Sequence, residues 1–204
     1  MARILGKPRR HSEGGKAVAL TVADMLVMDD PIRALPLDER ESTARRAMDA
    51  WGFCGVGIAA HETWTGVMII CPHNGLPRQH PLSAGGVDED VAGLIVTYIA
   101  SSASPLILGR KLCVSLTRLL RGRVSGIEAQ ATALTALATP LAPPRSWLTW
   151  MGFQPMRYPP HHYRLDFSDT VPWMEKALQW YRQSQVVLSP SGANLSSQSS
   201  TDIT

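Results

Sequence analysis

The chain has 204 residues, 45% of them hydrophobic, and a formal net charge of +3 at pH 7. This length and composition predict one folded α/β-sized domain with a sizeable core, and no run of about eighteen apolar residues is present that would cross a membrane. The small positive charge is spread along the chain, which disfavours nucleic-acid binding, because such an interface needs a dense basic face.

The two ends of the chain differ in composition from the middle. Residues 1–17 are basic and contain glycine without a period, so we expect a flexible leader, and the apolar run of a secretory signal does not follow them. Residues 184–204 are rich in Ser, Gln and Thr and predict a disordered tail. The 3 cysteines lie far apart, which disfavours a disulfide framework and favours the reducing cytoplasm. We therefore expect a single domain over residues 18–183.

Two helices are predicted before the first strand. Thr21 and Asp24 form a capping-box pattern at the start of a short helix. A second helix begins at Asp38 and ends at Gly52. Its apolar residues share one face, and its arginines, Arg40 among them, are expected largely on the opposite, solvated face.

Two β runs follow, over residues 54–60 and 66–71, and a connection of hairpin length joins them. The second run is apolar throughout, which is typical of a central strand covered on both faces. Residues 72–90 then form a long loop, and a structureless loop of this length in a compact domain is usually functional or mobile. Its His73 and His80, with the cysteine before it, match no zinc-site spacing, so no metal is expected.

The central unit of the chain spans residues 91–130. It predicts a strand at 92–100, a tight loop at 101–108, a helix beginning at Gly109, and a second strand at 124–130. A strand-loop-helix unit directs backbone N–H groups, and the positive end of the helix dipole, at whatever lies beyond the strand. An anionic ligand is the natural occupant of such a position.

The secondary structure of the stretch after the central unit is ambiguous. Residues 131–142 are rich in Ala, Thr and Leu and fit either a loop or a helix. A short helix then begins after Pro143 and Pro144 and ends at Gly152.

The domain is predicted to end with two strands, at 154–158 and 162–167, around a proline-rich turn. His161 and His162 fall at this turn, where we expect both side chains to face solvent. A last helix begins at Ser168.

Three short motifs lie along these predicted elements. They are Leu-Gly-Arg-Lys-Leu at 108–112, Arg-Gly-Arg-Val-Ser-Gly-Ile-Glu-Ala at 121–129, and Trp-Leu-Thr-Trp-Met-Gly-Phe at 147–153. In their order and spacing they resemble three motifs of the GNAT acetyltransferase family, namely a helix start, the strand after it and a later helix end. The resemblance is closest to the actinobacterial members of that family. The resemblance covers roughly residues 45–183. It implies an α/β fold with a mixed, mainly antiparallel sheet flanked by helices.

The resemblance also implies transfer of an acetyl group from acetyl-CoA to an amine, carried by a small molecule or by a protein. The donor-binding residues that it implies are Ile99, Ala100, Ser101, Ser104, Leu106, Ile107, Leu108, Gly109 and Arg110. Ser104, Pro105 and Ile107 stand where the family has a basic or amide residue and two glycines. Proline lacks an N–H and isoleucine disfavours the conformations open to glycine, so the sequence predicts a weakened anion site.

The catalytic residues of the family are matched by residue type only. Leu148 stands where many members have the tyrosine that protonates the thiolate. Tyr158, Tyr163 and Tyr98 are substitutes by residue type, and we take the first two as candidate acids. No glutamate lies within 92–100, so Asp88, Glu89 and Asp90 before it could act through a water, and Glu89 is the candidate base. The alternative function is a catalytically inactive protein of this fold that acts as a binding or regulatory partner. A homodimer is compatible with either function.

Overall fold

The computed structural model describes residues 15–28, 35–60, 63–85, 87–101, 103–124, 126–128, 131–138 and 143–168, together with residues 176 and 179. The expected tail and most of the expected leader lie outside these residues. Most of the expected last helix does too, although residues 176 and 179 are helical.

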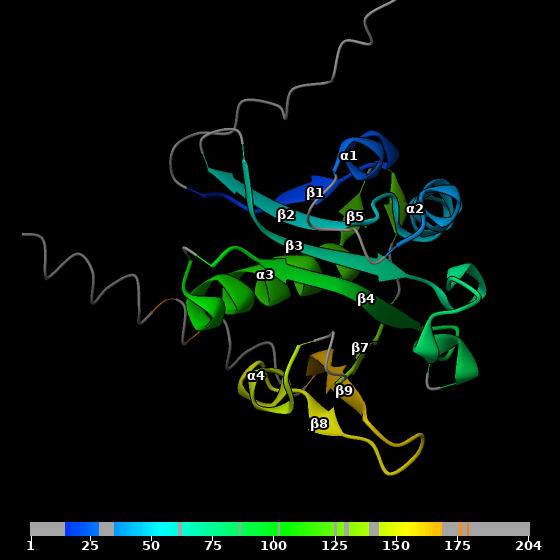
Figure 1. Cartoon of the computed structure of the whole chain (residues 1–204), viewed down its shortest axis with the longest axis vertical. Coiled ribbons are helices and arrows are strands. Elements are labelled where there is room, and N and C mark those ends of the chain that lie inside the picture. The colour runs from blue at the N-terminus through cyan, green and yellow to red at the C-terminus, as the bar shows by residue number, and fades with distance from the viewer. Residues whose placement is uncertain are drawn as a thin grey trace, which may run out of the picture.

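A single sheet of seven strands runs through the molecule in the order β1-β2-β3-β4-β7-β9-β8 (Figure 1). All neighbouring strands are antiparallel except β4 and β7, which are parallel. The prediction of a mixed, mainly antiparallel sheet flanked by helices is therefore confirmed. The strands are β1 (Val18–Leu20), β2 (Gly55–Ala60), β3 (Thr63–Cys71), β4 (Val91–Ile99), β7 (Ala133–Leu137), β8 (Gln154–Pro155) and β9 (His162–Asp166).

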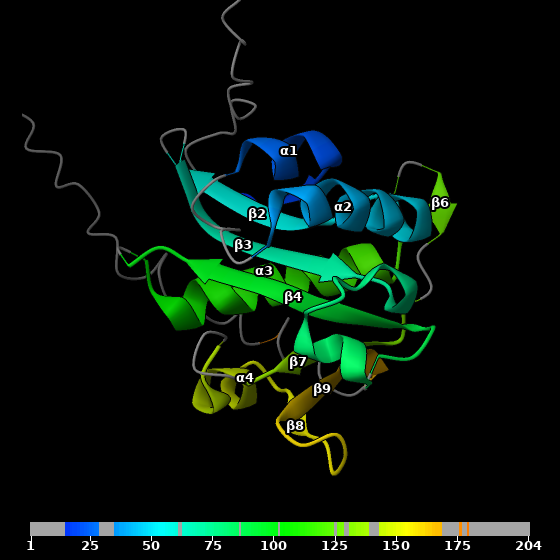
Figure 2. The ribbon, with the colours of Figure 1, turned by 45° about the vertical axis from the view of Figure 1, so that its right-hand side comes forward.

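Helices cover both faces of the sheet (Figure 2). On one face lie α1 (Val22–Val27) and α2 (Leu37–Trp51), and on the other lies α3 (Pro105–Leu120), which packs on β2 and β3. The short helix α4 (Arg145–Trp150) lies near the beginning of α3. None of the helices in the described part of the chain is long and apolar enough to cross a membrane.

The ends of α1 and α2 follow the sequence signals closely. The Asp24 carboxylate accepts hydrogen bonds from the backbone N–H and the hydroxyl of Thr21, both at 2.8 Å. The helix α2 ends at Gly52, whose φ of 77° lies in the left-handed region that favours glycine.

Arg40 of α2 is buried, whereas the helical pattern predicts a solvated position. Its guanidinium donates to the carbonyls of Leu35, at 2.9 Å, and Met28, at 3.1 Å. These carbonyls belong to the connection between α1 and α2. They take the place of the water molecules that would hydrate the guanidinium if it were exposed. Arg40 therefore fixes this connection against α2.

The strand predicted at 124–130 does not join the seven-stranded sheet within the described residues. A separate ribbon of two short strands forms here, β5 (Arg123–Val124) and β6 (Ile127–Glu128), with Gly126 between them at φ 85°. Besides β3, the strand β4 pairs with β7, which lies inside the stretch that fits a loop or a helix. All of its side chains are buried, so its sequence shows no alternation.

The 72–90 connection is packed onto the sheet, although the sequence predicts a structureless loop. It contains two short 3-10 helices, η2 (His73–Gly75) and η3 (Pro81–Ala84). A small apolar cluster joins it to β4 and β7, made of Leu82, Val87, Val91, Ala133 and Leu137. The connection is therefore an ordered cover over this part of the sheet.

Candidate active site

A gap opens where β4 and β7 part. The two strands pair only from Val91 opposite Ala133 to Leu94 opposite Ala136. Beyond this point β4 continues along β3 as far as Ile99, while β7 continues along β9. In the described part of the chain no strand pairs with residues 95–99 on the β7 side. We call this opening the β4–β7 gap.

Backbone N–H groups of β4 point into the β4–β7 gap. The N–H of Ala100 donates to the carbonyl of Thr65 in β3, at 2.9 Å. Because hydrogen bonding alternates along an antiparallel pair, the N–H groups of Thr97 and Ile99 point away from β3. Ile99 and Ala100 are both among the implied donor-binding residues. The N–H of Ile99 is free to bind a ligand in the gap, whereas the N–H of Ala100 is hydrogen-bonded within the sheet.

The helix α3 begins at Pro105, four residues before the position that the sequence predicts. The N–H of Leu108 donates to the carbonyl of Ser104 at 3.0 Å, so the amides from Leu108 onward are used inside the helix. The N–H groups of Ser104, Leu106 and Ile107 lie in the first turn, where a helix has no partners for them. Pro105 does not destabilise the helix, because an N–H at the first helical position has no hydrogen-bond partner within the helix.

Gly109 has a packing role that differs from the one expected for a phosphate loop. A Cβ at this position would lie 2.6 Å from the ring of Trp147 in α4. The indole N–H of Trp147 also donates to the carbonyl of Pro105, at 3.2 Å. The glycine therefore lets α4 lie directly against the first turns of α3.

The basic residues near this helix start point in different directions. Lys111 donates from Nζ to the carbonyl of Gly15, beside β1, and so is turned toward the N-terminal side of the sheet. Arg110 lies half-buried on the second turn, and the first turn carries no acidic side chain. Ser101 is exposed in the turn that links β4 to α3.

The two candidate tyrosines have opposite environments. Tyr158 is 81% exposed in the connection between β8 and β9. Tyr163 on β9 is buried, and its hydroxyl oxygen accepts a hydrogen bond from Nε of Arg145, at 2.7 Å. This bond also raises the pKa of Arg145 above its ordinary value. Tyr163 thus keeps its own O–H proton available beside the start of α4.

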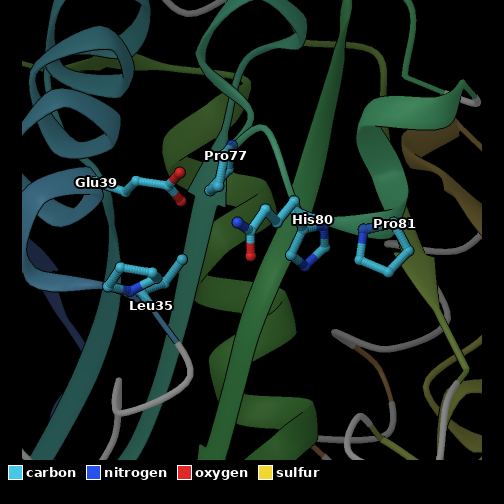
Figure 3. A pocket seen from close by; sticks show the side chains of 7 residues that line it. Leu35, Glu39, Pro77, His80 and Pro81 are labelled. Carbon is cyan, nitrogen blue, oxygen red and sulfur yellow. The ribbon is translucent and has the colours of Figure 1, made fainter.

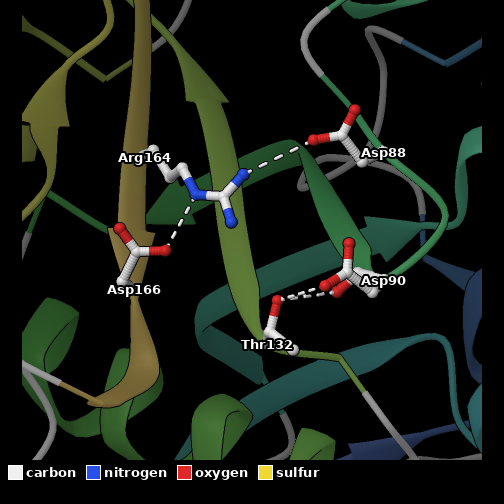
Figure 4. A network of polar contacts seen from close by, with 5 residues as sticks. All are labelled: Asp88, Asp90, Thr132, Arg164 and Asp166. Carbon is white, nitrogen blue, oxygen red and sulfur yellow. Dashed lines mark hydrogen bonds and ion pairs between the residues drawn. The ribbon is translucent and has the colours of Figure 1, made fainter.

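The acidic residues before β4 lie at the other end of that strand (Figure 4). Asp88 is 3.6 Å from the Arg164 guanidinium, and the Asp90 carboxylate accepts from the Thr132 hydroxyl at 2.7 Å. Glu89 is exposed beside them. A strand rises about 3.3 Å per residue, which separates Glu89 from the Ile99 end by roughly 30 Å. The structure does not bring Glu89 together with the other candidate residues.

A pocket of about 220 Å³ lies between the start of α2 and the 72–90 connection (Figure 3). Glu39 of α2 and His80 line it, together with Pro36, Pro77 and Pro81. The Glu39 carboxylate has no ion-pair partner within the described residues. It is also the one acidic group in the pocket lining, so a cationic group is the complementary ligand.

His80 joins this pocket to β4. A register shift between Ile69 and Ile70 of β3 leaves Ile95 of β4 as an extra residue, as in a β-bulge. The His80 ring lies near the backbone of Ile95, and its Nδ1 accepts from the N–H of Leu82 at 3.2 Å. Burial lowers the pKa of His80 below its ordinary value of 6.5.

His162, like Arg40, is a buried polar residue that the sequence misplaces. It is 5% exposed, and one ring nitrogen, Nδ1, lies 3.0 Å from the carbonyl of Pro160. The other, Nε2, is buried without a hydrogen-bond partner in the described part of the chain. The charge of His162 also adds to the lowering of the His80 pKa.

The cysteines take no part in this site. Cys54, Cys71 and Cys113 are all buried and unpaired, and burial raises the pKa of each thiol to about 12. Such thiols are not nucleophiles near neutral pH. Among the described residues, no group of three or more His, Cys, Asp or Glu is placed to hold a metal.

Neither the protein-family models nor the curated proteins gave a match to this chain. Among solved structures, the chain is similar to a GNAT family acetyltransferase from Brucella melitensis in complex with acetyl-CoA, with 17% identity and a TM-score of 0.46 over 76% of this chain and 90% of that one. It is also similar to the aminoglycoside acetyltransferase AAC(6')-Ib in complex with coenzyme A, with 13% identity and a TM-score of 0.48 over 75% of this chain and 95% of that one. At this level of similarity the function has to be argued from the chain's own residues.

The positions of two histidines, His80 and His162, could not be predicted from the sequence. His80 lies inside the 72–90 connection, and its contact with Ile95 depends on a bulge that no local signal marks. His162 stands next to a proline-rich turn, which predicts exposure. Only the pairing of His162 with Leu137 shows that the ring lies under the connection.

Proposed function

We propose that this chain is an acyltransferase of the GNAT type, which moves the acetyl group of acetyl-CoA to an amine. The observation that carries the proposal is the β4–β7 gap, with an outward N–H of Ile99 beside the first turn of α3. The three sequence motifs support the same family, and the actinobacterial affinity rests on them alone. Buried, unpaired thiols support the expected location in a reducing cytoplasm.

The residues present fit the donor at two places. The N–H of Ile99 would donate to the thioester carbonyl oxygen and stabilise the negative charge that develops there during attack. The N–H groups of Ser104, Leu106 and Ile107, at the positive end of the helix dipole, would hold the pyrophosphate, with Arg110 adding charge. The Ser104 side chain makes no capping bond, so its hydroxyl can join them.

The acceptor would reach the gap from the opposite face of the sheet, through the pocket beside α2. The pocket volume of about 220 Å³ suits a small-molecule amine better than a protein chain. Glu39 would attract its ammonium group through charge complementarity. Tyr163 is the better placed of the two candidate acids, because it lies beside α4 on the α3 side.

The proposal is tested by calorimetric titration of the chain with acetyl-CoA. Ser104→Asp and Ser104→Asn form a matched pair, since both side chains cap a helix well and differ by one charge. We expect Ser104→Asp to weaken acetyl-CoA binding about tenfold or more through repulsion of the pyrophosphate, with no loss of stability. Ser104→Asn should bind nearly as the unchanged chain does.

A specific observation also favours the alternative, a catalytically inactive protein of this fold that acts as a binding or regulatory partner. With Pro105 and Ile107 in place of two glycines, the first turn of α3 offers fewer close backbone contacts to a phosphate. If the unchanged chain shows no binding at millimolar acetyl-CoA, the acyltransferase proposal is wrong and this alternative stands.

A further inference from the structure

The pocket beside α2 places one carboxylate among mostly apolar walls (Figure 3). Glu39 is half-buried and forms no ion pair with any residue that the structure describes. Three prolines and Leu35 supply the apolar part of the wall. Partial burial of an unpaired charge is unfavourable, so an ammonium group bound in the pocket would stabilise this carboxylate.

The position of Glu39 at the start of α2 has a second physical reason, which the test below has to separate. A carboxylate in the first turn of a helix interacts favourably with the helix dipole. Asp38, the other acidic residue of that turn, is exposed and is absent from the pocket lining. The two neighbours thus share the dipole, and Glu39 alone adds the pocket.

The histidine of this pocket does not compete for Glu39. Nδ1 of His80 accepts from the N–H of Leu82, at 3.2 Å, so the proton of the neutral ring lies on Nε2. A protonated ring would place a second N–H against that of Leu82. Burial also lowers the pKa of His80 below 6.5, so the ring carries no charge near neutral pH. The pocket therefore offers a single anionic group to a cationic ligand.

The pocket is separated along β4 from the place where the thioester would be attacked. No described residue of β4 lines it, and His80 links it to that strand near the backbone of Ile95. Ile95 and Ile99 are four residues apart, which along a strand is roughly 13 Å. A ligand whose ammonium group is held by Glu39 therefore needs a second nitrogen, some distance along its chain, to react beside Ile99.

The face of β4 between these two places carries an aromatic ring. A Cβ at Gly66 of β3 would meet two leucines of α3, so this residue faces α3. Side chains alternate along a strand, so Val67 faces the opposite side, where α2 lies. Its cross-strand partner Tyr98 shares that side and is half-buried. An alkyl chain is the natural complement of such a surface.

We propose that the acceptor is a long-chain diamine whose two nitrogens have different roles. This inference rests on the proposed function and names its substrate class. Glu39 holds one nitrogen as an ammonium ion, and the alkyl chain passes along Tyr98 and brings the other nitrogen to the thioester beside Ile99. The reacting amine gives one proton to solvent and forms the C–N bond. The C–S bond breaks with its electron pair on sulfur, and the second amine proton ends on the CoA thiol.

The test measures CoA release by the full chain with acetyl-CoA and three amines. Two of them, 1,10-diaminodecane and decylamine, have the same alkyl chain and differ by the second ammonium group. The third, 1,4-diaminobutane, has both nitrogens but is too short to span the two places. We expect kcat/KM for 1,10-diaminodecane to exceed that of each of the others about tenfold or more, because it alone makes the charge-assisted contact and reaches Ile99.

Glu39→Gln and Asp38→Asn form a matched pair, since each removes one charge from the first turn of α2 and only Glu39 lines the pocket. We expect Glu39→Gln to lower kcat/KM for 1,10-diaminodecane to the level of decylamine, while that for decylamine itself stays unchanged. A merely structural role of Glu39 would lower both. Asp38→Asn should keep the preference of the unchanged chain.

Several results would overturn the inference. They are equal kcat/KM values for 1,10-diaminodecane and decylamine, a preference that survives Glu39→Gln, and a 1,4-diaminobutane that reacts as well as the longer diamine. No acetylation of any of the three amines by a chain that binds acetyl-CoA would also overturn it. Failure to bind acetyl-CoA in a calorimetric titration would be recognised separately, since it removes the proposed function itself.

Discussion

His80 couples the stability of the 72–90 connection to pH. Burial, the largest cause, lowers the pKa of its ring below 6.5, and the charge of His162 lowers it as well, while the nearby backbone of Ile95 raises it. Below pH 6.5 the unfolded chain therefore holds more protons at this residue than the folded chain does. The free energy of unfolding must then fall as the pH drops from 6.5 toward the folded pKa.

We predict that His80→Gln makes this fall shallower. Urea unfolding at a series of pH values between neutrality and mild acid measures the slope. The matched control is His73→Gln, an exposed histidine of the same connection, which should keep the slope of the unchanged chain. An equal slope in His80→Gln would show that the ring binds protons equally in the folded and unfolded chain, so that folding does not lower its pKa.

Single substitutions of Tyr163 and Tyr158 test which of the two is the general acid. We predict that Tyr163→Phe lowers kcat about 100-fold, because the phenol would no longer protonate the departing thiolate, and that Tyr158→Phe has little effect. Steady-state CoA release measures both, and urea unfolding checks that Tyr163→Phe, which loses the bond to Arg145, stays folded. A large loss in Tyr158→Phe alone would reverse the assignment.

At the residue scale, the sequence predicts side-chain chemistry better than side-chain position. The helical pattern places Arg40 on a polar face, yet its guanidinium is held by two carbonyls of a connection with no recognisable motif. His162 is misplaced for a related reason, because its burial depends on a register with Leu137. Contacts between residues far apart in sequence decide both positions.

At the scale of elements, the junction of α3 and α4 depends on the absence of a side chain at Gly109. Gly→Ala in a helix normally stabilises by up to about 1 kcal/mol. Here the added Cβ would lie 2.6 Å from the Trp147 ring, which is itself held by a hydrogen bond to Pro105. Overpacking of this kind costs about 1–3 kcal/mol, so the clash should outweigh the propensity.

We therefore predict that Gly109→Ala lowers the free energy of unfolding by about 1–2 kcal/mol in urea. Adding Trp147→Phe, which shortens the ring, should recover part of the loss. The two substitutions together then cost less than the sum of their separate effects, as a double-mutant cycle reveals for residues in contact. Additive effects would contradict this packing.

Some elements around the site can be predicted from the sequence and others cannot. The strand β4 and the helices α1 and α2 follow clear patterns, and the proline at the start of α3 marks its true first residue, although Gly109 drew the prediction four residues on. The strand β7 was missed, because Ala-Leu-Thr-Ala-Leu is rich in good helix formers. Its burial on both faces overrides that preference.

At the scale of the whole molecule, the site is a product of topology. Among the described residues, the strands β1–β4 and β7–β9–β8 pair with each other only along the parallel stretch at Val91–Leu94. A parallel pair needs a crossover, and here the crossover contains α3, whose first turn follows directly on the end of β4. The gap and the helix start therefore lie together whatever residues the loop contains, so the proposed donor site does not depend on the glycines for its position.

We propose that acetyl-CoA binds along the β4–β7 gap and the first turn of α3. Amide chemical-shift mapping by NMR during titration with acetyl-CoA tests this binding site. We expect saturable shifts that are largest for the amides of Ile99, Leu106 and Ile107, with those of Glu89 and Asp90 unchanged. Shifts confined to other parts of the chain, or no saturable shift at millimolar acetyl-CoA, would contradict it.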